Sequence, residues 1–158
     1  MGENTLLDAL NWFLLLEKGQ VEFYHHLSQA TDDAELCHGL QRFKKVEEEH
    51  VKVIAAKINI LELDQSRIKK ALGAVASAGL PVFGQIVGRV SNLAGMANML
   101  KAGYLTEKLA IRDYRKLINA VDDAEIRDML WSNLIDEESH CLWLYKKAKE
   151  LKKQRLKT

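Results

Sequence analysis

Two stretches of the sequence repeat each other at a distance of 90 residues: Asp32–His50, DDAELCHGLQRFKKVEEEH, and Asp122–His140, DDAEIRDMLWSNLIDEESH. Both open on Asp-Asp-Ala-Glu, continue with apolar residues three or four positions apart, and end on Glu-x-x-His. Apolar residues at that spacing occupy one face of an α-helix. The first aspartate pair also supplies an N-cap, because a side-chain oxygen there accepts a hydrogen bond from a free backbone N–H. Each stretch is therefore predicted to be helical.

The repeat extends to the segments that precede these stretches, which the same shift aligns without a gap. Glu17 falls on Glu107, and Tyr24 falls on Tyr114. Short connections within each half imply antiparallel neighbouring helices. The chain is therefore predicted to be a duplicated helical hairpin whose halves pack with pseudo-two-fold symmetry. Apolar residues at helical spacing predict helices over about 5–30, 34–61, 92–121 and 123–151.

The composition agrees with an all-α fold of one domain. The chain has 158 residues, 47% hydrophobic and only 7% aromatic, with a single proline. A β-sandwich would need turn residues at short intervals, and this chain is instead rich in helix formers. The length suffices to bury a core without disulfides. We expect one domain over 1–158, made of hairpin one (4–62), a long, partly helical crossover (63–91), hairpin two (92–152) and a basic C-terminal tail (153–158).

The inner part of the crossover, Ala71–Gly88 (ALGAVASAGLPVFGQIVG), carries no charged residue. Its length approaches that of a membrane span, but four glycines and Pro81 interrupt it. We favour a crossover packed on the bundle. A hairpin at a membrane surface and a true span are the alternatives.

Charge and cysteine content exclude several classes of protein. A formal net charge of +1 is unlike that of a dedicated nucleic-acid binder, which carries a strong basic excess. Cys37 and Cys141 form neither a disulfide framework nor a CxxC motif, which is typical of a reducing compartment. The N-terminal stretch lacks the basic region of a signal peptide. These features predict a cytoplasmic protein.

An acid or a histidine interrupts the apolar seam about halfway along each predicted helix. Burying four carboxylates without compensation is too unfavourable to be tolerated, and two divalent cations would balance four negative charges. Carboxylate oxygens with imidazole nitrogens suit Fe or Mn, and also Zn. We therefore predict a dinuclear metal site whose ligands are Glu17 on the first helix, Glu47 and His50 on the second, Glu107 on the third, and Glu137 and His140 on the fourth.

The alternative is that these acids lie on solvated helix faces, as runs of charge usually do. We assign Glu48, Glu49 and Glu138 to such faces. One Glu-x-x-His is common by chance on charged helices. Two copies at the same offset, each preceded by a seam glutamate, are far more specific.

Three further residues are candidates for positioning the ligands. Tyr24 and Tyr114 either hydrogen-bond a ligating carboxylate or are ordinary core residues. Asp136, next to Glu137, is a candidate for orienting a histidine, although the repeat places Val46 at the matching position.

These residues resemble those of the ferritin-like di-iron carboxylate superfamily, which includes rubrerythrin and bacterioferritin. The shared features are the Glu-x6-Tyr pairs at Glu17 and Glu107 and the Glu-x-x-His motifs at Glu47 and Glu137. Within that superfamily, the compact double repeat and the crossover LGAVASAGLPVFGQIVG, followed by LAGMANMLKAGYLTEK, are most similar to the demethoxyubiquinone hydroxylase family. The resemblance implies a ferritin-like four-helix bundle that holds two iron ions, with Mn or Zn as alternatives.

The function that the resemblance implies is that of a di-iron oxidoreductase. It would activate O2 or peroxide and hydroxylate a hydrophobic, quinone-like substrate at the inner face of a membrane. An external electron donor is needed, since the chain lacks the paired CxxC motifs of a rubredoxin domain. The alternatives are a rubrerythrin-like peroxide reductase, a ferroxidase or iron-storage subunit, and a metal-free helical interaction module. Homodimerisation through exposed apolar faces, with Trp12 and Trp143 as contributors, is a further expectation.

Overall fold

The computed structural model describes residues 3–61 and 93–156 of the chain. This part is all-α, as the sequence predicts, and the helix ends agree with the predicted ends to within a few residues. The predicted crossover, including its uncharged stretch 71–88, lies outside the described residues. Among the helices of 3–61 and 93–156, none combines the length and the hydropathy needed to cross a bilayer. The helices are α1 (Glu3–Gln29), α2 (Ala34–Ile60), α5 (Leu93–Ala120) and α6 (Ala124–Arg155).

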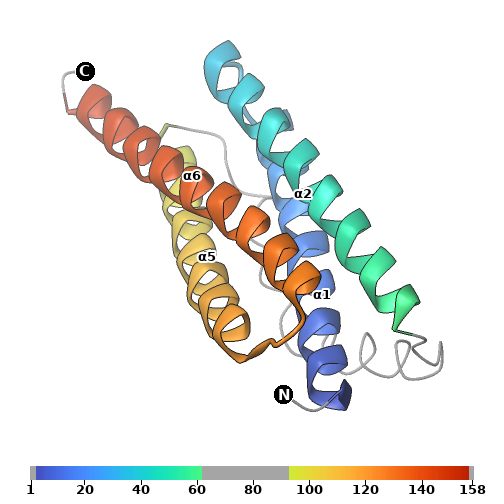
Figure 1. Cartoon of the computed structure of the whole chain (residues 1–158). Helices are drawn as coiled ribbons and strands as arrows, with labels where there is room; N and C mark the ends of the chain where they lie inside the picture. The colour runs from blue at the N-terminus through green and yellow to red at the C-terminus, as the bar shows by residue number, and fades with distance from the viewer. Residues whose placement is uncertain (1–2, 62–92, 157–158) are drawn as a thin grey trace.

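The helices form two antiparallel hairpins, α1 with α2 and α5 with α6, which confirms the predicted arrangement (Figure 1). Each connection is only three or four residues long, and each ends on an aspartate that caps the next helix. The Asp33 side chain accepts a hydrogen bond from the backbone N–H of Leu36 at 2.9 Å, and Asp123 accepts one from Ile126 at 2.9 Å. Both copies of the Asp-Asp-Ala-Glu motif therefore begin a helix in the same way.

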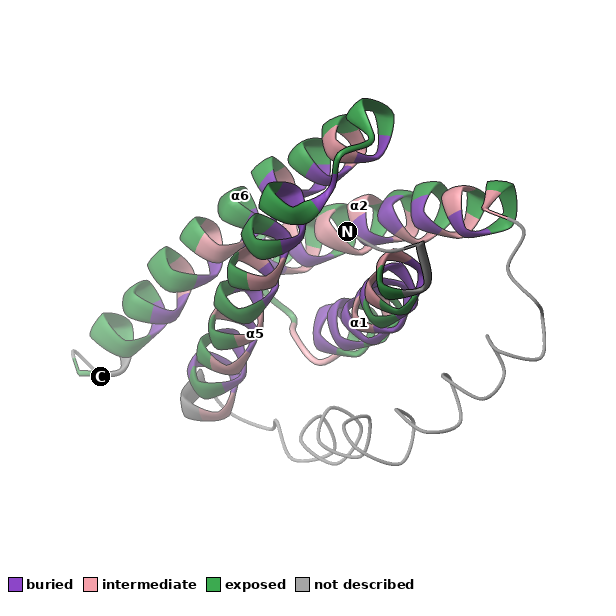
Figure 2. Cartoon of the chain, turned by 60° about the horizontal axis from the view of Figure 1, so that its bottom comes forward, coloured by how far each residue is buried: buried purple, intermediate pink, exposed green. Residues whose placement is uncertain are grey.

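The hairpins meet along two seams, where α2 lies next to α6 and α1 next to α5. The buried residues line the facing sides of the helices, and the outer sides are exposed (Figure 2). The interior contains two apolar clusters rather than one. One cluster is built around Leu10, Ile54, Leu117 and Leu130, and the other around Leu27, Leu40, Leu100 and Leu144. A layer of buried polar side chains lies between them.

Gly39 on α2 lies against Trp143 of α6. A Cβ at position 39 would lie 2.4 Å from Cζ2 of the Trp143 ring, which is too close for carbon atoms. Alanine normally stabilises a helix interior by about 1 kcal/mol relative to glycine. We expect Gly39→Ala instead to lower the free energy of unfolding by about 1–3 kcal/mol, because Trp143 would have to move. Urea denaturation measures the difference, and a variant as stable as the parent would contradict this packing.

Candidate metal centre

The six side chains that the sequence singles out meet in the polar layer between the two apolar clusters. Every helix contributes at least one of them, from near its middle, because the repeat places a charged residue on each apolar seam. They are buried, with 0% to 3% of each residue exposed: Glu17, Glu47, His50, Glu107, Glu137 and His140.

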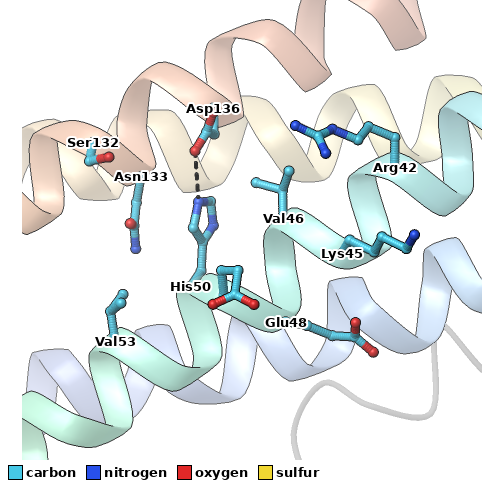
Figure 3. Close-up of a pocket in the computed structure, with 10 residues that line it drawn as sticks. Arg42, Lys45, Val46, Glu48, His50, Val53, Ser132, Asn133 and Asp136 are labelled. Carbon is cyan, nitrogen blue, oxygen red and sulfur yellow. Dashed lines mark hydrogen bonds and ion pairs between the residues drawn. The ribbon is translucent and has the colours of Figure 1, made fainter.

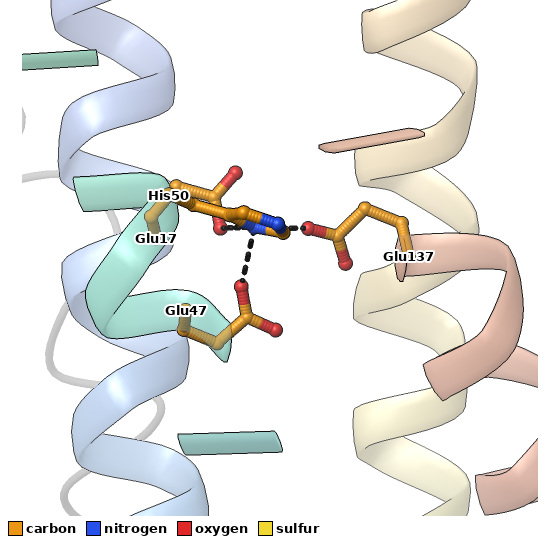
Figure 4. A group of neighbouring side chains, drawn as sticks. All are labelled: Glu17, Glu47, His50 and Glu137. Atoms are coloured by element: carbon orange, nitrogen blue, oxygen red, sulfur yellow. Dashed lines mark hydrogen bonds and ion pairs between the residues drawn. The ribbon is translucent and has the colours of Figure 1, made fainter. Parts of the chain in front are cut away.

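The first group of potential ligands consists of Glu17, Glu47, His50 and Glu137 (Figure 4). One atom from each residue lies within 4.8 Å of the others. Nδ1 of His50 is 3.0 Å from Oε2 of Glu47, 3.3 Å from Oε1 of Glu137 and 3.5 Å from Oε2 of Glu17. Three carboxylates from three helices thus converge on one imidazole nitrogen.

The second group consists of Glu47, Glu107, Glu137 and His140, again with ligand atoms within 4.8 Å of one another. Nδ1 of His140 is 2.8 Å from Oε1 of Glu47 and 3.8 Å from Oε2 of Glu137. Glu47 and Glu137 therefore belong to both groups. Since a carboxylate has two oxygens, each of these residues can bind two neighbouring cations at once.

Several buried atoms of this layer have no hydrogen-bond partner within the described residues. They include Oε2 of Glu17, Oε1 of Glu47, Oε1 of Glu137 and Nδ1 of His140. Nδ1 of His140 is close to Glu47, but the two do not align as a hydrogen bond. Unpartnered buried acceptors are costly, and several of them facing one another are the arrangement that a cation satisfies. A set of three carboxylates and one imidazole per group fits Fe, Mn or Zn.

The pKa values of these groups reflect the crowding of carboxylates in a dry interior. Burial, together with the charge of Glu137, raises the pKa of Glu17 and of Glu107 well above the usual range of a carboxyl. Burial opposes ionisation of Glu137 too, but its close contacts with Glu107, His140 and His50 outweigh burial and hold the pKa of Glu137 below its usual range.

The pKa values of both histidines are raised, whereas burial alone would lower them. Burial disfavours the imidazolium of His140, yet the nearby carboxylates of Glu137 and Glu47 raise its pKa from 6.5 to about 9. The pKa of His50 is raised further by the same kind of contact with Glu137, Glu17 and Glu47. Without a metal, protons on these imidazoles compensate the buried negative charge, and a bound cation would displace them.

Two tyrosine hydroxyls link one hairpin to the other. Tyr24 on α1 donates a hydrogen bond to Oε1 of Glu107 on α5, and Tyr114 on α5 donates one to Oε1 of Glu17 on α1. Each tyrosine therefore contacts the seam glutamate of the opposite half. This reciprocity is what pseudo-two-fold symmetry requires, and it gives both tyrosines a positioning contact as well as a place in the core.

Gln20, a buried residue at the centre of the layer, is not among the residues predicted from the sequence. Its Nε2 donates to Oε2 of Glu107 at 2.6 Å and to Oε2 of Glu137 at 3.3 Å. Gln20 is three positions after Glu17, so it lies on the same helix face, and that spacing could have identified it. The repeat hid it, because Ala110 occupies the matching position.

The surroundings of the two histidines differ. Nε2 of His50 lies 3.2 Å from Oδ2 of Asp136, the carboxylate that the sequence suggested for orienting a histidine. The His140 ring instead packs on the Phe43 ring, with centroids 4.1 Å apart. A carboxylate on the outer nitrogen fixes the orientation of an imidazole, and within residues 3–61 and 93–156 only His50 has one. The two halves of the layer therefore have the same potential ligands, but the residues that contact the two histidines differ.

Comparisons of the chain with protein-family models, with curated proteins and with solved structures found no match. The fold and the buried carboxylate–histidine layer are thus the features from which a function is inferred.

Proposed function

We propose that this protein is a ferritin-like oxidoreductase that holds two iron ions and reduces O2 or peroxide with electrons from a separate donor. The observation that carries the proposal is that Glu47 and Glu137 belong to both four-residue groups. Two carboxylates common to two sets of ligands are what a pair of neighbouring cations needs. Four carboxylates in total also match the charge of two divalent ions.

In this proposal Glu17 and His50 complete the ligands of one ion, and Glu107 and His140 complete those of the other. Mn or Zn would fit the same donor set. Two iron ions, when bound, supply redox chemistry in steps of two electrons, and reduction of peroxide by two electrons and two protons yields two water molecules.

The chain itself supplies ligand geometry and a dry interior. The Tyr24 and Tyr114 hydroxyls fix the orientation of Glu107 and Glu17 through hydrogen bonds. Gln20 restrains the remaining oxygen of Glu107. The apolar clusters on both sides of the layer exclude bulk water, which strengthens each electrostatic interaction within it.

Membership of the ferritin-like superfamily is part of the same proposal, and within it the sequence most resembles the demethoxyubiquinone hydroxylase family. The hydrophobic quinone-like substrate, the contact with the inner face of a membrane and the homodimer are part of the proposal too. The sequence resemblance supports the superfamily, the quinone-like substrate and the membrane contact. The uncharged stretch 71–88, on which the membrane contact rests, lies outside the described residues.

The test is the iron content of the purified protein together with its absorption spectrum before and after exposure to O2 or peroxide. We expect two iron ions per chain and near-ultraviolet absorption of oxidised iron, because the interior offers two sets of buried ligands. Glu137→Gln should bind iron more than about 100-fold more weakly and so lose both signals, since Glu137 belongs to both groups of ligands.

The matched control is Glu138→Gln at the adjacent, exposed position, where Glu138 forms an ion pair with Arg115. It should keep the iron and the spectrum of the parent. If the protein takes up no iron, manganese or zinc, the proposal is wrong and a metal-free helical interaction module is the remaining alternative. A hollow multisubunit shell in a solution size measurement would favour iron storage instead.

A further inference from the structure

A groove of about 510 Å³ lies between α2 and α6 and reaches the metal centre beside His50 (Figure 3). Val53 and Asn133 line one end of it, and Arg42 and Lys45 line the other. The volume falls within the range of small-molecule sites, roughly 300–1,000 Å³. It is much larger than O2 or peroxide requires.

The groove exists because the two halves of the repeat differ at two positions. Val53 aligns with Trp143, and Asn133 aligns with Phe43. On the other side of the α2–α6 seam these two large rings occupy the equivalent place beside His140. The Phe43 ring packs on His140, and the Trp143 ring lies 5.0 Å from Phe43 with its edge against Gly39. One histidine of the centre is thus covered by aromatic rings, and the other adjoins an open groove.

The charges around the groove are not balanced. Its acidic residues already have basic partners: Glu48 lies 3.0 Å from Lys44, Glu49 lies 2.5 Å from Lys52, and Asp136 lies 3.2 Å from His50.

Arg42 and Lys45 form no ion pair within residues 3–61 and 93–156, and both are exposed. Two uncompensated cations at one end of a groove of this size match a ligand that carries an anionic group, which a guanidinium binds through paired hydrogen bonds.

We propose that this groove binds a small organic anion, a carboxylate or a phosphate monoester, with its charged group on Arg42 and Lys45 and its body over Val53 toward His50. The proposal rests on the proposed function in one respect, that this anion is the substrate presented to the metal centre. Binding itself depends only on the groove. It refines the expectation of a hydrophobic substrate, because the groove that reaches the centre among the described residues has a charged end.

The experiment measures binding of benzoate, phenyl phosphate and neutral benzamide to the metal-free full chain by NMR titration. We expect benzoate or phenyl phosphate to bind at least tenfold more tightly than benzamide, and the stronger of the two identifies the anionic group. The double variant Arg42→Gln/Lys45→Gln should lose that preference. Val53→Trp, which copies the residue of the other half, should weaken binding of all three probes at least tenfold.

The matched control is Lys146→Gln/Lys149→Gln, which removes two exposed cations of α6 away from the groove and should bind as the parent does. In cobalt-loaded protein, the bound anion should also shift the visible spectrum, because His50 lines the groove. Equal affinity for benzamide and the anions, or an unchanged preference in the double variant, would overturn the proposal. Selective anion binding by a chain that takes up no metal would overturn the proposed function alone, and two bound metals without anion selectivity would overturn the groove proposal alone.

Discussion

Replacing Glu47 by alanine is expected to abolish binding of both metal ions, whereas replacing Glu17 by alanine should leave one ion in place. Glu47 belongs to both groups of ligands, and Glu17 belongs only to the group that contains His50. In Glu17→Ala the second group, with Glu107 and His140, keeps all four of its ligands. We expect the affinity for either ion to fall more than about 100-fold in Glu47→Ala, since loss of a direct ligand exceeds the 10–100-fold effect of its supporting partners.

Cobalt(II) titration followed by elemental analysis gives both stoichiometries. Glu48→Ala is the matched control, because Glu48 is adjacent in sequence, points outward and contacts Lys44. It should bind two ions per chain. Two ions per chain in Glu47→Ala would show that this carboxylate is not shared, and loss of both ions in Glu17→Ala would show that the two groups do not fill independently.

The metal-free protein is expected to become less stable as the pH rises from about 6.5 to 9, and metal loading should remove this trend. The pKa values of Glu17, Glu107, His50 and His140 are all raised in the folded chain, that of His140 to about 9. Over this pH range the folded chain therefore holds more protons than the unfolded chain. The free energy of unfolding consequently falls with increasing pH. Bound cations replace these protons, so the stabilisation by metal should grow with pH.

Thermal unfolding of metal-free and zinc-loaded protein at pH 6.5 and pH 9 measures both effects. One ion at about 1,000 times its dissociation constant adds about 4 kcal/mol, which corresponds to about 8–16 °C in a chain of this size. Glu107→Gln removes one of the excess protons and should flatten the pH trend of the metal-free protein. Glu22→Gln, on an exposed face of α1, should leave it unchanged. A metal-free protein whose stability rises over this range would contradict the assigned protonation.

Much of the fold and of the polar layer could be predicted because the same pattern of residues occurs in both halves of the chain. The aspartates at positions 33 and 123 mark equivalent helix starts, and the spacing of Glu47 and His50 recurs at Glu137 and His140. A helical period then places each of these side chains on a buried seam. The confirmed predictions are those that depend on periodicity, on capping and on repetition.

The features that the sequence did not predict depend on contacts between the halves. The spacing of Tyr24 and Glu17 says nothing of the hydrogen bond that Tyr24 makes to Glu107. Gln20 has no polar counterpart in the second half, so a search for repeated residues passes over it. The groove likewise arises where Val53 replaces the tryptophan of the other copy. These features depend on residues that differ between the two halves or on contacts between them. They can be recognised only when the positions of the helices are known.

Neither half of the chain holds a complete group of ligands. Glu137 joins three side chains of the first hairpin, and Glu47 joins three of the second. A single hairpin that associates with an identical copy about a two-fold axis would supply the same six groups. Such a self-associating ancestor would already have possessed the whole centre. After fusion of two copies, each half could mutate independently of the other. The difference between Val53 and Trp143, which occupy equivalent positions, is a change on one side of the centre that only a fused chain can accumulate.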